Sequence, residues 1–242
     1  MELAIDTSTE TASIALSSQG NMVAELTWQA GQNHTAEILP NLNHVLQMAS
    51  IQLEDLDGLI VATGPGSFNG LRVAMSVAKG LAFALNIPLV GISTLEAVAF
   101  PYAATALPVC PIQNAGRNEI ATALFRTEHG EWRCLIKEHI TTSDALFDEI
   151  EGQTIFCGKI PNEVKLQLRE RLGEQALIME GAANLRRAGY LAELGWRRLK
   201  EGDFDHSPTL QPLYLRKPSI TISQKQRPPR DENIDKPKLA PL

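Results

Sequence analysis

The feature that most constrains the fold of this chain is an order of elements that occurs twice. In each half, the hydrophobic periodicity predicts three consecutive strands, a helix, and then strands that alternate with helices. The first-half elements are strands over 2–7, 11–18 and 22–28, a helix over 34–50, a strand over Gly58–Ala62, a helix over Leu71–Leu85, a strand over Leu89–Ile92 and a helix that Ser93 or Thr94 opens. The second-half elements are strands over Pro108–Ile112, Glu119–Arg126 and Trp132–Lys137, a short helix capped by Ser143, a strand over 154–158, a helix over Asn162–Leu172, a strand over Ala176–Met179 and a helix over Asn184–Lys200.

Each half has the order expected of a mixed sheet that is covered by helices. Three antiparallel strands followed by right-handed β-α units place helices on the faces of such a sheet. Two lobes of this kind form the α/β architecture of actin-like and sugar-kinase-like (ASKHA) proteins, whose lobes are ribonuclease-H-like. We therefore predict an N-terminal lobe over 1–105 and a C-terminal lobe over 106–216.

The last residues have a different composition from the rest of the chain. Seven of the 14 prolines lie between Pro208 and Pro241, and 217–242 contains few aliphatic residues. Such a segment buries too little surface to offset its ordering entropy, so we expect a disordered tail over 217–242. Its basic runs are short, which favours a solvated tail over an arm that contacts nucleic acid.

The overall composition excludes several classes of protein. The 242 residues carry a formal charge of −6, which argues against binding nucleic acid or a membrane surface through bulk positive charge. No apolar run approaches the roughly 20 residues needed to span a bilayer, and the N-terminus resembles a strand rather than a signal peptide. The three cysteines are widely spaced, which suits a reducing cytoplasm better than a disulfide framework or a zinc site.

A glycine-rich loop, Gly64-Pro65-Gly66-Ser67-Phe68-Asn69-Gly70, precedes the second predicted helix. Free N–H groups at a helix N-terminus suit an anion, which makes Gly64, Gly66 and Ser67 candidate nucleotide-binding residues. The spacing matches neither a Walker loop nor the dinucleotide G-x-G-x-x-G motif. The alternative is a tight strand-to-helix turn with glycines at positive φ.

The turn after the first strand contains the second candidate group, Asp6, Thr7 and Ser8. In two-lobed ATPases this turn holds a metal-bound phosphate, opposite a matching aspartate turn in the second lobe. Here the second-lobe counterpart is Asn114, which lacks the negative charge that Mg²⁺ prefers. The alternative role for Asp6 is a turn residue that accepts a backbone hydrogen bond. The histidines show no metal-binding spacing, so no metal site is predicted.

Three segments, LAIDTST…ASIAL, HTAEILPNLNHVL and GLIVATGPGSFNGLRVAMSVAKGLAFALNIPLVGISTLEAVA, resemble the TsaB family, formerly YeaZ. The resemblance covers about the first hundred residues, and GPGSF-x-GLR followed by AKGLA is specific to this family. NAGRNEIATALF, NLRRAGYLAELGWRRL and PLYLRKP match more weakly. The chain departs from the family at Asn69 and Asn114, where threonine and aspartate are common. The catalytic relative TsaD carries two metal-binding histidines where this chain has Thr94 and Val98.

The resemblance implies a non-catalytic scaffold that pairs with a TsaD-like subunit in making threonylcarbamoyladenosine on tRNA. It implies no catalytic residue and no required cofactor, with at most weak or shared binding of ATP or ADP with Mg²⁺. It also implies a TsaE-like ATPase in the assembled complex, tRNA contact through the complex and a homodimer of the isolated chain. The expected interface lies on the first two helices, at His34, Glu37, Asn41, His44, Arg72, Ser76 and Lys79.

Three other functions are compatible with parts of the sequence. An ASKHA-type kinase or ATPase would need a second acidic residue opposite Asp6, and a metallopeptidase would need the paired histidines. A regulator that binds a nucleotide without hydrolysis would need only the turn over 6–9 and the glycine loop over 64–70. Neither enzymatic requirement is visible in the sequence.

Overall fold

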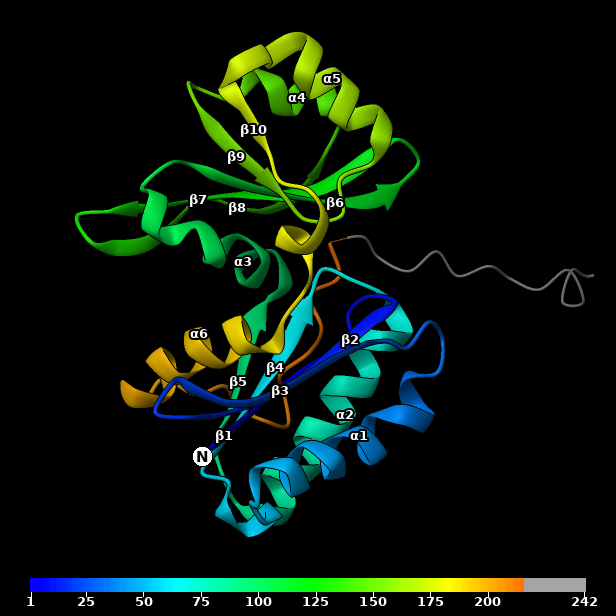
Figure 1. Ribbon diagram of the computed structural model, residues 1–242, viewed down its shortest axis with the longest axis vertical. Coiled ribbons are helices and arrows are strands. Elements are labelled where there is room, and N and C mark those ends of the chain that lie inside the picture. Colours follow the sequence, from blue (N-terminus) through cyan, green and yellow to red (C-terminus); the bar gives the residue numbers. More distant parts are fainter. Residues whose placement is uncertain (216–242) are drawn as a thin grey trace, which may run out of the picture.

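The computed structural model describes residues 1–215, and the predicted tail over 217–242 lies outside the described residues. Residues 1–215 form two stacked lobes, each built on one five-stranded sheet (Figure 1). Helix α3 (Thr94–Ala99) lies between the two sheets and opens at Ser93, whose Oγ accepts a hydrogen bond from the N of Glu96 at 3.4 Å. Within this part of the chain, every helix falls short of the length and apolar character that crossing a membrane requires.

The first sheet has the strand order β3-β2-β1-β4-β5. Its strands are β1 (Glu2–Asp6), β2 (Thr11–Ser18), β3 (Asn21–Gln29), β4 (Gly58–Gly64) and β5 (Leu89–Ser93). The first three strands are antiparallel neighbours, and β4 and β5 continue the sheet in parallel with β1. The hairpin between β2 and β3 turns at Gln19 and Gly20, which both have positive φ, as a tight hairpin requires.

The alternation of side chains along β1 assigns the helices to the two faces of this sheet. Successive residues of a strand point to opposite faces. Leu3 and Ile5 belong to the core that α1 (His34–Ala49) and α2 (Phe68–Leu85) cover. Ala4 points to the other face, where it packs with residues of α6 (Ala188–Lys200).

The second sheet has the order β10-β9-β6-β7-β8, which repeats the order of the first sheet when read from its other edge. Its strands are β6 (Val109–Gly116), β7 (Glu119–Glu128), β8 (Glu131–Thr141), β9 (Thr154–Cys157) and β10 (Ala176–Ile178). Helices α4 (Ser143–Asp148) and α5 (Asn162–Leu172) pack on one face, and α3 packs on the other. Thr142, rather than Ser143, caps α4. The predicted repeat of element order is therefore present in both lobes.

The placement of helix α6 differs from the expectation. The sequence analysis assigned it to the lobe over 106–216, but it packs against the first sheet in one cluster with Ala4 and Ile60. Gly195 of α6 lies so close to Ile60 that an added Cβ would be 2.4 Å from its Cγ1. An amphipathic pattern indicates that a helix has an apolar face, but not which sheet that face covers. The first lobe thus consists of two separate segments of the chain.

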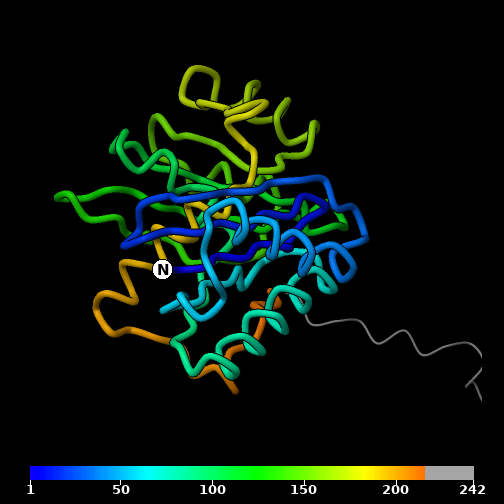
Figure 2. Tube along the Cα trace, turned by 60° about the horizontal axis from the view of Figure 1, so that its bottom comes forward, coloured from blue at the N-terminus to red at the C-terminus, as the bar shows by residue number. Residues whose placement is uncertain are grey.

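Residues 203–215, which we call the C-terminal strap, also belong to the first lobe. Asp205 forms an isolated antiparallel bridge with Leu89 of the edge strand β5. Further along, the N of Leu213 donates to the carbonyl O of Thr63 at 2.7 Å. The strap, orange in Figure 2, runs past α2 and places a chain segment beside the glycine-rich loop.

Replacing Gly195 by alanine tests the contact between α6 and the first sheet. Because the new Cβ would overlap Ile60, we expect Gly195→Ala to lower the free energy of unfolding by about 1–3 kcal/mol. Gly80→Ala in α2 is the matched control, since nothing lies within 4 Å of its added Cβ and alanine stabilises a helix by up to ~1 kcal/mol. Urea denaturation followed by circular dichroism measures both variants. Equal stability of the two would contradict the contact.

Candidate functional site

The two predicted nucleotide-binding segments pack against each other. In the turn after β1, Thr7 Oγ1 donates to the carbonyl O of Gly70 at 2.7 Å and accepts from the N of Ala74 at 3.2 Å. The N of Ser67 donates to the carbonyl O of Ser8 at 2.7 Å. These bonds join the end of the first strand to the start of α2 and occupy groups that an anion would otherwise use.

Close packing explains the glycines of the loop. An added Cβ at Gly66 would lie 2.5 Å from the carbonyl O of Ser8, and one at Gly70 would overlap the carbonyl O of Thr7. The space in front of these two glycines is therefore filled by the turn after β1, so close packing, and not a positive φ, accounts for glycine at 66 and 70. Gly64, the other candidate glycine, has a φ of +112°, a conformation that favours glycine.

Asp6 is buried and has partners for both oxygens of its carboxylate. Its Oδ1 accepts from the N of Ser8 at 2.8 Å, which is the turn geometry expected of an aspartate at this position. Its Oδ2 lies 3.9 Å from Nη1 of Arg186, and the Arg186 side chain is only 9% exposed. Burial lowers the pKa of Arg186, and the charge of Asp6 opposes that effect.

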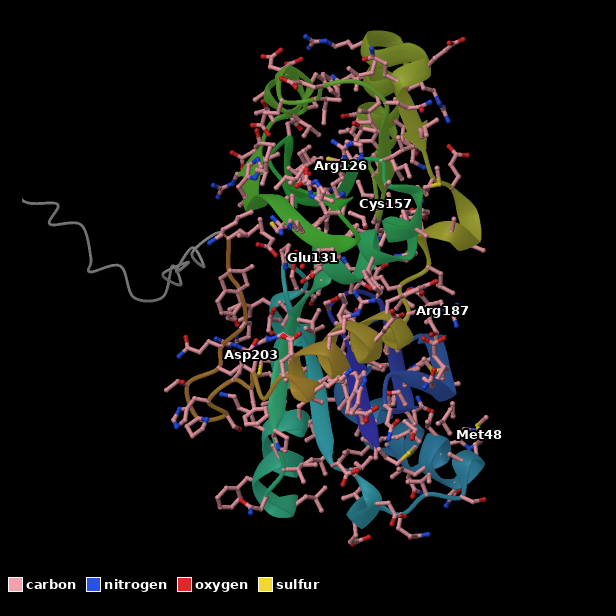
Figure 3. The ribbon with its side chains drawn as sticks, turned by 90° about the vertical axis from the view of Figure 1, so that its left-hand side faces the viewer. Met48, Arg126, Glu131, Cys157, Arg187 and Asp203 are labelled. Atoms are coloured by element: carbon pink, nitrogen blue, oxygen red, sulfur yellow. The ribbon has the colours of Figure 1, made fainter. Side chains whose placement is uncertain are left out.

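The guanidinium of Arg186 also bonds to both lobes. Nη1 donates to Oγ of Ser8 in the first lobe, and Nη2 donates to Oε1 of Gln113 on β6 at 2.7 Å. The sequence analysis did not identify Arg186, because two adjacent arginines precede α6 and the pattern does not distinguish them. The neighbouring Arg187 instead pairs with Glu25, with Nη2 and Oε2 2.6 Å apart, and lies where the two lobes meet (Figure 3).

Asn114, the counterpart of Asp6 in the second lobe, is turned to its own backbone. Its Oδ1 accepts from the N of Gly116 at 2.7 Å, and the residue is exposed. Thr94 is buried and donates to the carbonyl O of Pro65. Residues 1–215 contain no group of three or more histidine, cysteine, aspartate or glutamate side chains that could hold a metal ion. These residues do not fit a shared Mg²⁺ ion, because one carboxylate is paired with arginine and its counterpart is a neutral amide.

A polar cleft of about 700 Å³ lies beside this cluster and is lined by both lobes. First-lobe residues on its wall include Ser8, Glu10 and Ser67, and second-lobe residues include Asn114 and Lys159. Lys159 and Glu10 form an exposed ion pair across it, with Nζ and Oε2 3.3 Å apart. Opposite charges meet here, so the cleft carries no single sign of charge that would select an anion.

The predicted interface residues of α1 differ in exposure. His44 is exposed, and Glu37 and Asn41 are half-buried. Glu37 accepts a hydrogen bond from Nε1 of Trp28 at 2.8 Å. His34 is 6% exposed, so it lies inside the lobe rather than on the outer face where the sequence analysis placed it. The spacing of the polar residues along α1 did not reveal that His34 itself is buried, although Thr35 and Ala36 beside it are exposed.

The predicted interface residues of α2 meet the C-terminal strap. Nε of Arg72 donates to Oη of Tyr214 at 3.2 Å, and Nζ of Lys79 donates to the carbonyl O of Pro208 at 3.3 Å. Ser76 is exposed. Sequence reasoning could not place the strap on α2, because its contacts join residues more than a hundred positions apart.

Large apolar side chains on the two helices are exposed. Leu39 and Met48 of α1 are 55% and 60% exposed, and Phe83 of α2 is 89% exposed. Met48 lies on the outer surface of the first lobe (Figure 3). The sequence analysis did not select these residues, since an apolar side chain on an amphipathic helix is normally assigned to the core.

Comparison with known proteins relates this geometry to a family. The family model described as TsaD, tRNA N6-adenosine threonylcarbamoyltransferase, matches residues 28–223. The tRNA threonylcarbamoyladenosine biosynthesis protein TsaB of Bacillus subtilis (strain 168) is 30% identical over 217 residues, or 88% of this chain and 93% of the relative.

Solved structures agree with this relationship. YeaZ from Pseudomonas aeruginosa matches with a TM-score of 0.75 and 25% identity, over 88% of this chain and 99% of that chain. EutJ, an ethanolamine utilization protein from Carboxydothermus hydrogenoformans, matches with a TM-score of 0.52 and 11% identity over 80% of this chain and 89% of that chain, a likeness of fold alone. The predicted α/β fold of two lobes, each a mixed sheet flanked by helices, is confirmed. With a relative aligned over nearly its whole length and a YeaZ structure of the same architecture, the chain belongs to the TsaB (YeaZ) family.

Proposed function

We propose that this chain is a non-catalytic subunit in the biosynthesis of threonylcarbamoyladenosine on tRNA, where it pairs with a TsaD-like catalytic subunit. The names of its relatives, which refer to threonylcarbamoyladenosine biosynthesis, support the pathway. Asp6 is paired with Ser8 and Arg186, and Asn114 is hydrogen-bonded to its own backbone turn, which supports a non-catalytic role. The observation that carries the pairing is the exposed apolar surface of α1 and α2.

The part of this surface that we call the α1–α2 face consists of the exposed residues Ser76, Gly80, Phe83 and Ala84, which share the outer side of α2. Burying one large apolar side chain is worth about 1.5–3 kcal/mol, and contiguous exposed apolar surface marks protein contacts. Gly80 and Ala84 project little from α2, so the backbone of a partner helix can approach it closely. Phe83 stands next to Ala84 as a side chain that a partner would cover.

On this proposal, fewer of the expected polar residues belong to the interface. Arg72 and Lys79 bind the C-terminal strap, and His34 is buried, so these three support the lobe rather than the partner. Ser76 and His44 remain exposed. The proposed contact is therefore mainly apolar, with a few neutral polar groups.

The remaining partners are those that the family resemblance implies. One apolar face would serve both a homodimer of the isolated chain and the complex with the TsaD-like subunit, so the two assemblies compete for it. A TsaE-like ATPase and the tRNA join through the assembled complex, which operates in the cytoplasm. On this proposal the subunit requires no cofactor of its own, and any ATP or ADP with Mg²⁺ is bound weakly or shared with the complex.

Charge placed on the α1–α2 face should abolish pairing without unfolding the lobe. We expect Phe83→Glu and Ser76→Glu each to weaken binding to the TsaD-like subunit about 100-fold or more, since an unpaired carboxylate would be desolvated. The monomer should lose no more than about 0.5 kcal/mol of stability, because both positions are exposed. Binding titration and urea denaturation are measured on the same samples.

Phe204→Glu is the matched control, since Phe204 is also an exposed phenylalanine, at 53%, and lies on the strap. It should bind the TsaD-like subunit as the unaltered chain does. Unchanged binding by Phe83→Glu would mean that the interface lies elsewhere. Unfolding of the Ser76→Glu monomer would instead contradict the exposed position of that residue.

The pathway itself is tested in cells from which the chain has been depleted. We expect mass spectrometry of tRNA nucleosides to show loss of threonylcarbamoyladenosine, because the catalytic subunit has no partner. The unaltered chain and Phe204→Glu should restore the modification, and Phe83→Glu should not. An unchanged level of the nucleoside after depletion would overturn the proposed function.

The non-catalytic role is tested on the isolated chain. We expect no hydrolysis of ATP and no cleavage of peptides above the buffer blank, because Asp6 is already paired and its counterpart is Asn114. Activity that survives rigorous purification and disappears in Asp6→Asn would show that the chain is an enzyme.

A further inference from the structure

The chain returns from the second lobe to the first through residues 184–188, and both ends of this segment are held. At one end, Oδ1 of Asn184 accepts from the N of Gly158 in the second lobe at 2.9 Å. At the other end, the N of Ala188 donates to Oγ of Ser13 on β2 of the first lobe at 2.9 Å. The residues in between therefore span the junction of the lobes with little freedom.

Arg186 lies in the middle of this segment and contacts the same strand in each repeat. On the first-lobe side it meets Asp6 and Ser8, at and just after the end of β1. On the second-lobe side it meets Gln113, near the end of β6. Strands β1 and β6 hold equivalent central positions in the two sheets. The guanidinium thus joins two matching points of the repeat.

The charge of Arg186 is balanced within this cluster. A buried guanidinium keeps its proton at neutral pH and needs a counter-charge. Asp6 supplies it, with Oδ2 3.9 Å from Nη1. The nearby thiol of Cys157 does not, because burial raises its pKa well above the ordinary value and keeps it neutral. Removal of either Asp6 or Arg186 would therefore leave the other as an unpaired buried charge.

We propose that Arg186 is an internal cation that ties the two lobes together at the point where this fold could otherwise share a Mg²⁺-nucleotide between them. The tie keeps the interlobe cleft at one width and makes the position of Asp6 unavailable to a divalent cation. The other charge contact across the cleft, Lys159 with Glu10, is exposed to solvent, where an ion pair contributes little. The inference does not depend on the identity of any partner protein.

The width of the cleft can be measured by electron spin resonance between two spin labels. Gln47 on α1 and Glu170 on α5 are exposed, and replacing each by cysteine provides one label in each lobe. The exposed Cys134 is changed to serine, while Cys110 and Cys157 are buried. We expect one narrow distance distribution for this labelled chain.

Arg186→Gln should lose the narrow distribution, because its shorter neutral side chain cannot bridge both lobes. Gln113→Leu should also broaden it, since this change removes the second-lobe contact and leaves Asp6 paired with Arg186. Arg187→Gln is the matched control, because the neighbouring arginine pairs with Glu25 at the surface, and it should keep the narrow distribution. If Gln113→Leu and Arg186→Gln both remain narrow, the tie is disproved. If Arg186→Gln does not fold, the distance distribution of Gln113→Leu alone tests the tie: a broad distribution supports it and a narrow one disproves it.

A double-mutant cycle tests the charge pair. We expect Asp6→Asn and Arg186→Gln each to lower the midpoint of thermal unfolding, and the double variant to lose less than the sum of the two shifts, because neither charge is then left alone. Additive shifts would mean that the two groups do not act as a pair.

Calorimetric titration with Mg²⁺-ATP tests whether the internal cation excludes the nucleotide. We expect no binding to the unaltered chain. Binding that vanishes in Arg186→Gln would overturn the proposal, because the guanidinium would then be a phosphate ligand. Binding that vanishes in Asp6→Asn but persists in Arg186→Gln would also overturn it, because the carboxylate would be free to hold a metal.

Discussion

The arrangement of the first lobe depends on the close approach of the turn after β1 to the glycine-rich loop after β4. Gly66 and Gly70 lie directly against the carbonyl groups of Ser8 and Thr7, and a side chain at either glycine would push the two segments apart. This contact sets where α2 begins. It also fixes Pro65, whose carbonyl O accepts from Thr94 at the start of α3. One packing constraint therefore positions the helix with the exposed Phe83 and the helix that connects the lobes.

The same constraint changes the chemistry of a loop that has the appearance of an anion site. Hydrogen bonds from Ser67 and Thr7 are used within the lobe, and the carboxylate of Asp6 is used by Arg186. In the turn and the loop, polar groups that could bind a ligand are instead paired with the backbone of the lobe and with a guanidinium.

Much of the architecture could be predicted from the sequence because it depends on local periodicity. The strand alternation over 2–29, the glycine loop and the repeated order of elements all correspond to observed elements. The position of α6, the burial of His34 and the role of Arg186 could not be predicted in this way. Each depends on contacts between residues far apart in the chain, and one arginine of an adjacent pair has no local signature.

The return of α6 to the first lobe has a consequence for synthesis on the ribosome. The sheet face that includes Ala4 and Ile60 is complete only when α6, which begins at Ala188, has emerged. Synthesis at roughly 5–20 residues per second leaves this apolar face uncovered for several seconds while the second lobe is made. During that interval the nascent first lobe exposes apolar surface of the kind that chaperones bind. The first lobe therefore becomes complete only after the strands of the second lobe have been made, when α6 packs on the first sheet.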